Sequence, residues 1–170
     1  MITLEPLSPD TIGEAIRLTD RVFDYPAFWW EKPSFVLWLS LNNGFIAKTI
    51  YRFLGVEWAT YWVARDEEGA VVGITGLYTY LKEPEAYWLG WTCVDPQVRG
   101  RKIGSGLVDF AIAQTREAGK AYLRLYTWDD EAATVARQLY ERRGFHLTRT
   151  EDLKTYRVLY YDLALSNSHP

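Results

Sequence analysis

The amino-acid sequence predicts one α/β domain, and three observations indicate that fold class. The chain has 170 residues, which is close to the length of one ordinary domain. Hydrophobic residues make up 48% and charged residues 24% of it, as in chains that bury a core. Strand and helix patterns alternate along the chain, and no Pro-, Gly- or Ser-rich linker separates them. We therefore expect a single domain over residues 1–165 and a flexible tail over residues 166–170.

The hydrophobic pattern divides this domain into its elements. Short apolar or alternating runs indicate strands, and apolar residues that recur every three or four positions indicate helices. The almost wholly apolar run at residues 86–94 predicts a single central strand. The predicted strands are residues 2–7, 57–65, 70–80, 86–94, 121–128, 145–150 and 155–163. The predicted helices are one after a cap at Ser8 or Asp10, an apolar helix or a pair broken at Asn42-Asn43-Gly44 within residues 35–56, one over 103–118, and one after a cap at Asp129 or Asp130.

Composition excludes several classes of protein. A net charge of −3 leaves no overall basic field for a nucleic acid. The single cysteine, Cys93, cannot form an intramolecular disulfide, and with only two histidines we expect no metal site. The first residues lack a signal-peptide pattern, and no run reaches about 18 continuous apolar residues. We expect a cytoplasmic protein with neither a nucleic-acid nor a membrane partner.

The strongest chemical signal is VDPQVRGRKIGSGL at residues 94–107, an apolar strand followed by a glycine-containing turn and the start of a helix. The first turn of a helix has free backbone N–H groups and the positive end of the helix dipole, so it can hold a phosphate. Three basic residues add positive charge at this turn. The alternative is a well-capped connection with a solvated basic loop. The P-loop and Rossmann glycine patterns are both absent.

The second signal is ARQLYERRGF at residues 136–145. Tyr140 falls on the apolar side of the predicted helix, one turn after Ala136. It can be a tyrosine of the core, or a phenol that points into a cleft between two strands and donates a proton.

Together these two motifs resemble the GNAT superfamily of acetyl-CoA-dependent N-acetyltransferases. The order of strand, turn, helix, strand, helix and Gly-Phe is similar over residues 71–146. The resemblance implies a central, mixed but mostly antiparallel sheet flanked by helices. It also implies transfer of the acetyl group of acetyl-CoA to a primary amine of a small molecule or a peptide, by direct attack.

The resemblance further implies a role for individual residues. Tyr140 would protonate the thiolate of coenzyme A, and Cys93 and Val94 would pair with the pantetheine arm. Two positions depart from the family pattern: Lys102 stands where a small residue is usual, and Ala133 where asparagine is frequent. One contact to the cofactor arm is therefore expected to be missing. The pyrophosphate loop would comprise Gln97, Val98, Arg99, Gly100, Arg101, Lys102, Gly104 and Ser105.

The general base is open at this stage. Many relatives carry a carboxylate on the central strand, but residues 87–91 contain none. Glu83 and Glu85, just before that strand, are the nearest candidates, and Glu57 is the third; each can also be a solvated surface carboxylate. Cys93 with His146 as its base is a further possibility, although a strand cysteine is more often an inert apolar residue.

The sequence is unusually aromatic, with eight Trp, twelve Tyr and seven Phe. Many of these rings must belong to the core. The remainder would suit an apolar or aromatic amine, or a cation held over ring faces. A second function stays open, a catalytically weakened acyl-CoA-binding module, and residues 35–56 could form a lid or a homodimer surface. The predicted acceptor residues are Trp29, Trp30, Tyr78 and Trp88.

Overall fold

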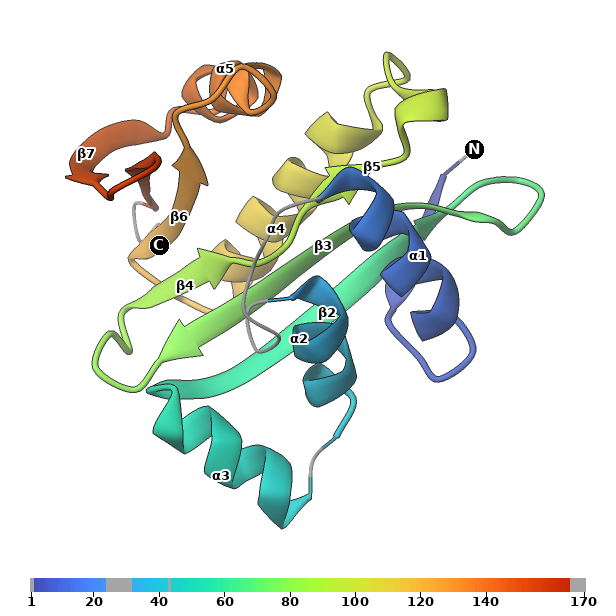
Figure 1. Cartoon of the computed structure of the whole chain (residues 1–170), viewed down its shortest axis with the longest axis horizontal. Helices are drawn as coiled ribbons and strands as arrows, with labels where there is room; N and C mark the ends of the chain where they lie inside the picture. The colour runs from blue at the N-terminus through green and yellow to red at the C-terminus, as the bar shows by residue number, and fades with distance from the viewer. Residues whose placement is uncertain (1, 24–31, 43, 166–170) are drawn as a thin grey trace.

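A computed structural model describes residues 2–23, 32–42 and 44–165, and these form one mixed sheet with helices on both faces (Figure 1). The sheet has eight strands in the order β1-β2-β3-β4-β6-β8-β7, with β5 paired to β3 outside that path. The β4–β6 pair is parallel and the other pairs are antiparallel. The predicted mixed, mostly antiparallel sheet is therefore confirmed. The strands are β1 (Thr3–Pro6), β2 (Val56–Arg65), β3 (Val71–Tyr80), β4 (Ala86–Leu89), β5 (Cys93–Val94), β6 (Tyr122–Trp128), β7 (His146–Asp152) and β8 (Arg157–Ala164).

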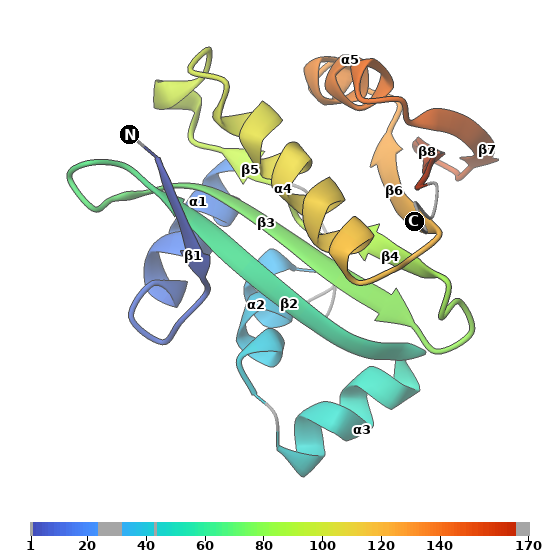
Figure 2. The ribbon, with the colours of Figure 1, turned by 180° about the vertical axis from the view of Figure 1, so that it is seen from behind.

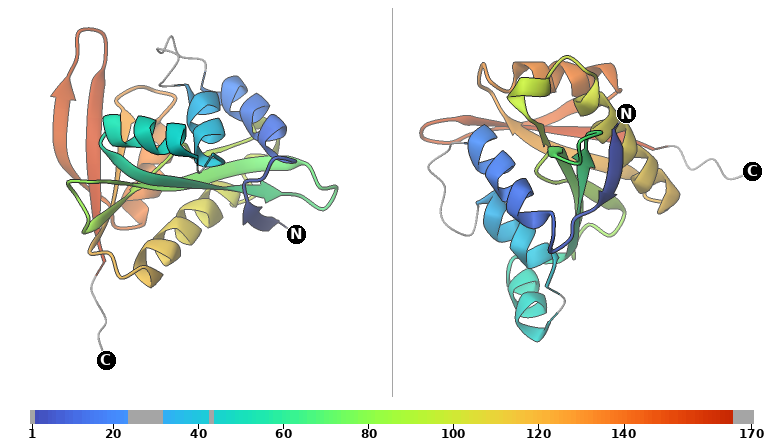
Figure 3. Two further views of the ribbon diagram at one scale, coloured as in Figure 1. Left: turned by 90° about the horizontal axis from the view of Figure 1, so that it is seen from below. Right: turned by 90° about the vertical axis from the view of Figure 1, so that its right-hand side faces the viewer.

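Five α-helices of the described chain divide between the two faces of the sheet (Figures 2 and 3). Apolar side chains from α1, α2 and α3 pack with one set of side chains of β2 and β3 in a first core cluster. Side chains of α4 and α5 pack with the opposite faces of β3, β4, β6 and β8 in a second cluster. The helices are α1 (Ile12–Val22), α2 (Pro33–Ser40), α3 (Phe45–Phe53), α4 (Ile103–Glu117) and α5 (Thr134–Arg142).

The predicted single strand over residues 86–94 is wrong, because the chain breaks it into β4 and β5. β4 ends at Leu89, which pairs with Leu77, and β5 begins at Cys93, which pairs with Ile74. Two residues of β3 therefore face three residues, 90–92, of the other chain segment, and such an extra residue is a β-bulge that bends the strand. An apolar pattern cannot reveal this break, because Gly90 and Trp91 do not interrupt the hydrophobic run.

One other local prediction needs correction, because the cap of α1 falls on Thr11, one residue beyond the predicted range. The predicted helix pair within residues 35–56 is confirmed as α2 and α3. On α3, Phe45 and Phe53 are 85% and 90% exposed. In the turn between β2 and β3, Gly69 takes a φ of +86°, a conformation that glycine adopts readily.

Candidate functional site

The turn between β5 and α4 presents a row of free backbone amides. A short 3₁₀ turn (Pro96–Val98) comes first, and it uses the amides of Gln97 and Val98, which donate to the side chain and the carbonyl of Asp95 at 2.9 and 3.0 Å. The next amide to donate is that of Gly106, to the Lys102 carbonyl at 3.0 Å. Between them, the amides of residues 99–105 form no hydrogen bond with the described chain. They are available to an anion at the start of a 15-residue helix.

Backbone conformation shapes this turn at two positions. Gly100 has a φ of +82°, which requires glycine or a strained residue. Lys102, the N-cap of α4, has a φ of +62° and is the only non-glycine residue with positive φ in the described chain. This conformation costs a side-chain-bearing residue about 1–2 kcal/mol. The predicted departure at Lys102 thus coincides with a position where glycine would relieve the backbone strain.

Positive charge at the turn is uncompensated. Arg99, Arg101 and Lys102 are exposed, and none forms an ion pair with a described residue. A β-carbon on Gly104 would lie 3.6 Å from the nearest side-chain atom, on Val94, so the fold itself does not require glycine there. Its missing side chain leaves room beside the free amides. Amides, cations and open space together fit a diphosphate.

β6 lies beside β4, but β5, which follows the bulge, diverges from β6 (Figure 1). β5 pairs with β3, whereas β4 pairs with β6. The amide of Asp95 donates to the Val72 carbonyl at 2.9 Å, so by antiparallel alternation Cys93 also bonds to β3 and Val94 turns its backbone groups away from it. Val94 therefore offers a free strand edge to an extended molecule between β5 and β6.

Tyr140 lies near Cys93, on the face of the sheet that α4 and α5 cover. It lies on α5, is 8% exposed, and packs against Phe145 with the ring centroids 5.8 Å apart. Burial raises the pKa of its phenol to about 12, and the nearby Cys93 thiol raises it a little further. The hydroxyl makes no hydrogen bond within the described chain, so it is a neutral proton donor without a partner beside β5.

Cys93 itself is not poised as a nucleophile. It is buried, and burial raises the pKa of its thiol to about 12, against a small lowering by Arg99. The thiolate that a nucleophilic cysteine needs is therefore scarce at neutral pH. His146, its predicted partner, lies exposed on β7 at the outer edge of the sheet.

A sequence model of the acetyltransferase (GNAT) domain matches residues 57–147, a segment that contains the amide turn, the bulge and Tyr140. The chain belongs to the GNAT acetyltransferase family. Members of this family are acetyltransferases, and they use acetyl-CoA as the acetyl donor.

Individual proteins agree with this membership. The GNAT chain is 37% identical to a mycothiol acetyltransferase of Propionibacterium freudenreichii over 93 residues, which are 52% of this chain and 28% of that protein. It thus spans about a quarter of that relative. Its fold resembles that of Arabidopsis thaliana NAA60 in complex with a bisubstrate analogue (TM-score 0.74, 14% identity, covering 99% and 100% of the two chains). It also resembles the NatC complex bound to Gag peptide and CoA (TM-score 0.71, 18% identity, covering 97% and 99%).

The two carboxylates predicted as the base of this GNAT protein are held together by one arginine. Arg124 of β6 donates to Glu83 at 2.8 Å and to Glu85 at 3.0 Å, and it approaches Asp162 of β8 at 3.3 Å. Glu83 also accepts from the indole N–H of Trp88 at 2.9 Å. Both candidates therefore anchor the ends of β4, β6 and β8, rather than standing free beside the bulge.

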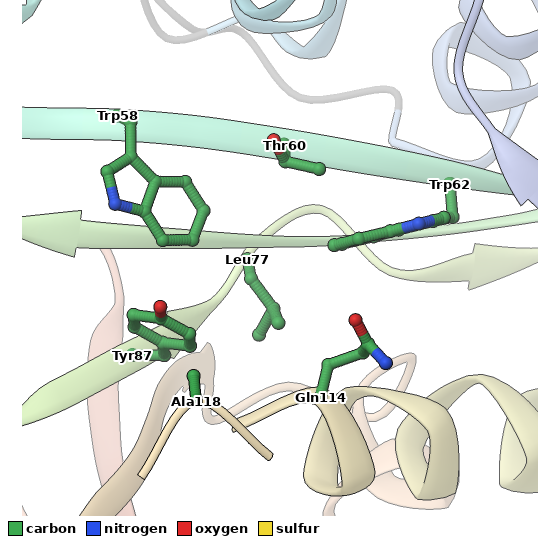
Figure 4. A pocket seen from close by; sticks show the side chains of 7 residues that line it. All are labelled: Trp58, Thr60, Trp62, Leu77, Tyr87, Gln114 and Ala118. Carbon is green, nitrogen blue, oxygen red and sulfur yellow. The ribbon is translucent and has the colours of Figure 1, made fainter. Parts of the chain in front are cut away.

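The third candidate base, Glu57 of β2, lies close enough to Tyr87 of β4 to affect its ionisation. Its charge raises the pKa of Tyr87, after the larger effect of burial. Tyr87 lines a cavity of about 230 Å³ against α4, together with Trp58 and Trp62 (Figure 4). Neither Tyr140 nor any residue of the bulge lines this cavity, so it is separate from the predicted site between β5 and β6. Glu57 therefore lies apart from that site.

The predicted acceptor residues Tyr78 and Trp88 belong to a continuous group of rings on the face opposite α4. Their centroids are 6.3 Å apart, and Tyr160 of β8 continues the row at 6.5 Å from Trp88. At the bulge, Trp91 contacts Phe23 at 4.7 Å and Trp128 at 6.0 Å. Trp29 and Trp30 lie outside the described residues. We call this group the aromatic wall: Phe23, Tyr78, Tyr80, Trp88, Trp91, Tyr126, Trp128 and Tyr160.

Two features of the site escape sequence reasoning. Arg124 reads as an ordinary outward residue of a strand, and Tyr61 of β2 as an ordinary apolar one, because their partners are 30 or more residues away. Ala133, where the family often has asparagine, is the N-cap residue of α5, and its amide donates to the Asp130 side chain at 2.7 Å. Within the described ranges no helix is long and apolar enough to cross a membrane, and no three potential metal ligands lie together.

Proposed function

We propose that the chain transfers an acetyl group from acetyl-CoA directly to a primary amine, and that Tyr140 protonates the departing thiolate. The observation that carries this proposal is the position of Tyr140: a buried, neutral, unpartnered phenol beside β5, where the strands part. The free amides of residues 99–105 lie at the other end of the same strand and would hold the diphosphate of the donor. The chain thus offers a diphosphate-binding turn and a proton donor along the same strand, β5.

The backbone and Tyr140 divide the chemical work. The free edge of Val94 would align the pantetheine arm by strand-like hydrogen bonds. Attack by a neutral amine on the thioester carbonyl puts negative charge on its oxygen, and the free backbone N–H of Val94, just after the bulge, can stabilise that charge in a site without bulk water. Collapse expels a thiolate, whose proton comes from the Tyr140 hydroxyl. No covalent enzyme intermediate is needed.

A phenol with a pKa of about 12 suits this role. It keeps its proton at any physiological pH, so the donor is always present. The thiolate of coenzyme A, with an ordinary thiol pKa near 8.5 in water, becomes a stronger base when it forms in the same apolar surroundings. Burial that weakens the acid therefore also strengthens the base that it must protonate.

The aromatic wall supports an apolar or aromatic amine as the acceptor. Its rings run from the bulge at Trp91 to Trp88 and Tyr160, so an acceptor whose amine reaches the bulge would lie along them. In a panel of amines, aromatic or long aliphatic acceptors should outperform short polar amines and aminoglycosides. Preference for the polar amines would refute this assignment. A lid or a homodimer surface formed by residues 35–56 stays a prediction.

One observation favours a second function, a CoA-binding regulatory module. The predicted bases Glu83 and Glu85 are engaged with Arg124, so we assign neither of them the proton-accepting step. Release of free thiol from acetyl-CoA, measured over diverse amines with the wild type and Tyr140→Phe, separates the two functions. Turnover that depends on Tyr140 supports the transferase, and binding of coenzyme A without turnover supports the module.

A further inference from the structure

The bulge between β4 and β5 is supported from within the core by Tyr61 of β2. This side chain is 3% exposed, and its hydroxyl accepts a hydrogen bond from the Trp91 amide at 3.4 Å. A bulge leaves its extra residue without a partner in the strand ladder. Tyr61 supplies that partner from another strand. Burial raises the pKa of its phenol strongly, so the group stays neutral.

Two glycines make room for this ring. A β-carbon on Gly76 would lie 2.3 Å from the Tyr61 ring, and one on Gly90 would lie 2.6 Å from its hydroxyl oxygen. Neither glycine has a positive φ, so close approach of the ring, and not backbone conformation, explains why a side chain would not fit. Tyr61, Gly76 and Gly90 form a matched set around the bulge.

The rest of the bulge is also bonded. The Gly90 amide donates to the Gly76 carbonyl at 2.7 Å. The Thr92 hydroxyl donates to the Gly90 carbonyl at 3.0 Å, and the hydroxyls of Thr92 and Thr75 lie 2.9 Å apart. Each of the three residues of the bulge therefore has a fixed contact. Such fixed dipoles are what lets backbone groups stabilise a developing charge without first reorganising.

We propose that Tyr61 is a positioning residue for acetyl transfer: by holding the Trp91 amide, it fixes the bulge so that the free N–H of Val94, directly after it, faces the thioester oxygen. This inference rests on the proposed function. Tyr61 touches no reacting atom and acts only through the backbone of residues 90–93.

Tyr61→Phe tests this role, because the ring that fills the space stays and only the hydroxyl is lost. Misplacement by a fraction of an ångström should lower kcat by about tenfold, while the KM for acetyl-CoA stays within about twofold. Tyr51→Phe is the matched control. Tyr51 is buried in the same core cluster, but its hydroxyl has no hydrogen-bond partner in the described chain. Its loss should leave both constants unchanged.

Hydrogen exchange of the Trp91 amide gives a second readout that needs no turnover. Exchange should be faster in Tyr61→Phe than in the wild type and in Tyr51→Phe. An unchanged kcat, an equal loss in both variants, a rise in KM alone, or unchanged exchange would each overturn the inference. If the wild type binds no coenzyme A, the proposed function falls, and the catalytic role of Tyr61 with it. A wild type that acetylates amines alongside a fully active Tyr61→Phe would remove the role of Tyr61 alone.

Discussion

The amide turn after β5 and the aromatic wall are built from the chain in different ways. The turn takes all its groups from one contiguous segment, residues 93–105, where strand, 3₁₀ turn and helix follow each other directly. The aromatic wall takes its rings from β3, β4, β6 and β8 and from Phe23 at the end of α1. A site made by consecutive residues leaves a pattern in the sequence, whereas a site made by strand pairing does not.

The two regions also differ in whether their charged side chains form ion pairs. At the turn, three cations stand without described ion-pair partners, which favours an anionic ligand. Beside the aromatic wall, Arg124 is surrounded by Glu83, Glu85 and Asp162, so charges there mainly satisfy each other. This difference supports our proposal that electrostatic contacts bind the donor and that apolar contacts select the acceptor.

Tyr140→Phe should have the largest effect on catalysis of the variants of the donor site. Loss of a general acid typically costs 10²–10⁴-fold, so kcat should fall by about 100-fold with little change in the KM for acetyl-CoA. Because the pKa of Tyr140 is about 12, wild-type kcat should show no decline from its ionisation up to about pH 10. Steady-state release of coenzyme A measures both.

Tyr161→Phe is the control for that variant. Tyr161 is also buried on the α5 side of the sheet, but its hydroxyl donates to Glu141 at 3.3 Å, away from the bulge. Its loss should leave kcat unchanged. Equal losses in both variants would show a general packing effect and contradict the role of Tyr140.

Gly104→Ala should separate binding from stability at the turn. A methyl group there meets no atom of the described fold closer than 3.6 Å, and alanine favours a helix over glycine by about 0.5–1 kcal/mol. The melting temperature should rise, while the methyl group intrudes on the diphosphate and raises the KM for acetyl-CoA about tenfold. Gly106→Ala, two residues further along α4 with open space around it, should raise the melting temperature and leave KM unchanged. An unchanged KM in Gly104→Ala would place the diphosphate elsewhere.

Glu83→Gln and Glu85→Gln test whether either carboxylate beside the aromatic wall is the general base. Both carboxylates hold Arg124, so we expect kcat to change by less than about threefold, far below the 10²–10⁴-fold effect of a true base. Profiles of kcat against pH for the two variants measure this. A 100-fold loss, together with disappearance of the acidic limb of the profile, would identify that carboxylate as the base.

Cys93→Ala should have the smallest effect on catalysis. With a thiol pKa of about 12, Cys93 should resist alkylation by iodoacetamide at pH 7, and the variant should retain wild-type kcat. The small cavity should cost about 1 kcal/mol of stability, which thermal unfolding can measure. Abolished turnover in a folded variant would revive the cysteine mechanism.

Sequence reasoning predicted the mixed sheet, which the structure confirms, because the signals of its strands and helices are local. Gly100 and the basic residues of the turn were proposed from one contiguous motif, and the role of Tyr140 from the resemblance to the family; both stay predictions. Sequence reasoning missed the bulge, because Gly90 and Trp91 continue an apolar run, and it missed Tyr61, whose partner is 30 residues away. The role of Arg124 was hidden for the same reason, since only the parallel pairing of β4 with β6 brings it to Glu83.

Calorimetric titration of the chain with coenzyme A and with pantetheine tests the central claim most directly. Each charge-assisted hydrogen bond to the diphosphate contributes about 1.5–3 kcal/mol, so coenzyme A should bind with one-to-one stoichiometry and at least about tenfold more tightly than pantetheine. Equal affinities, or no heat with coenzyme A, would contradict a diphosphate grip by the amides of residues 99–105.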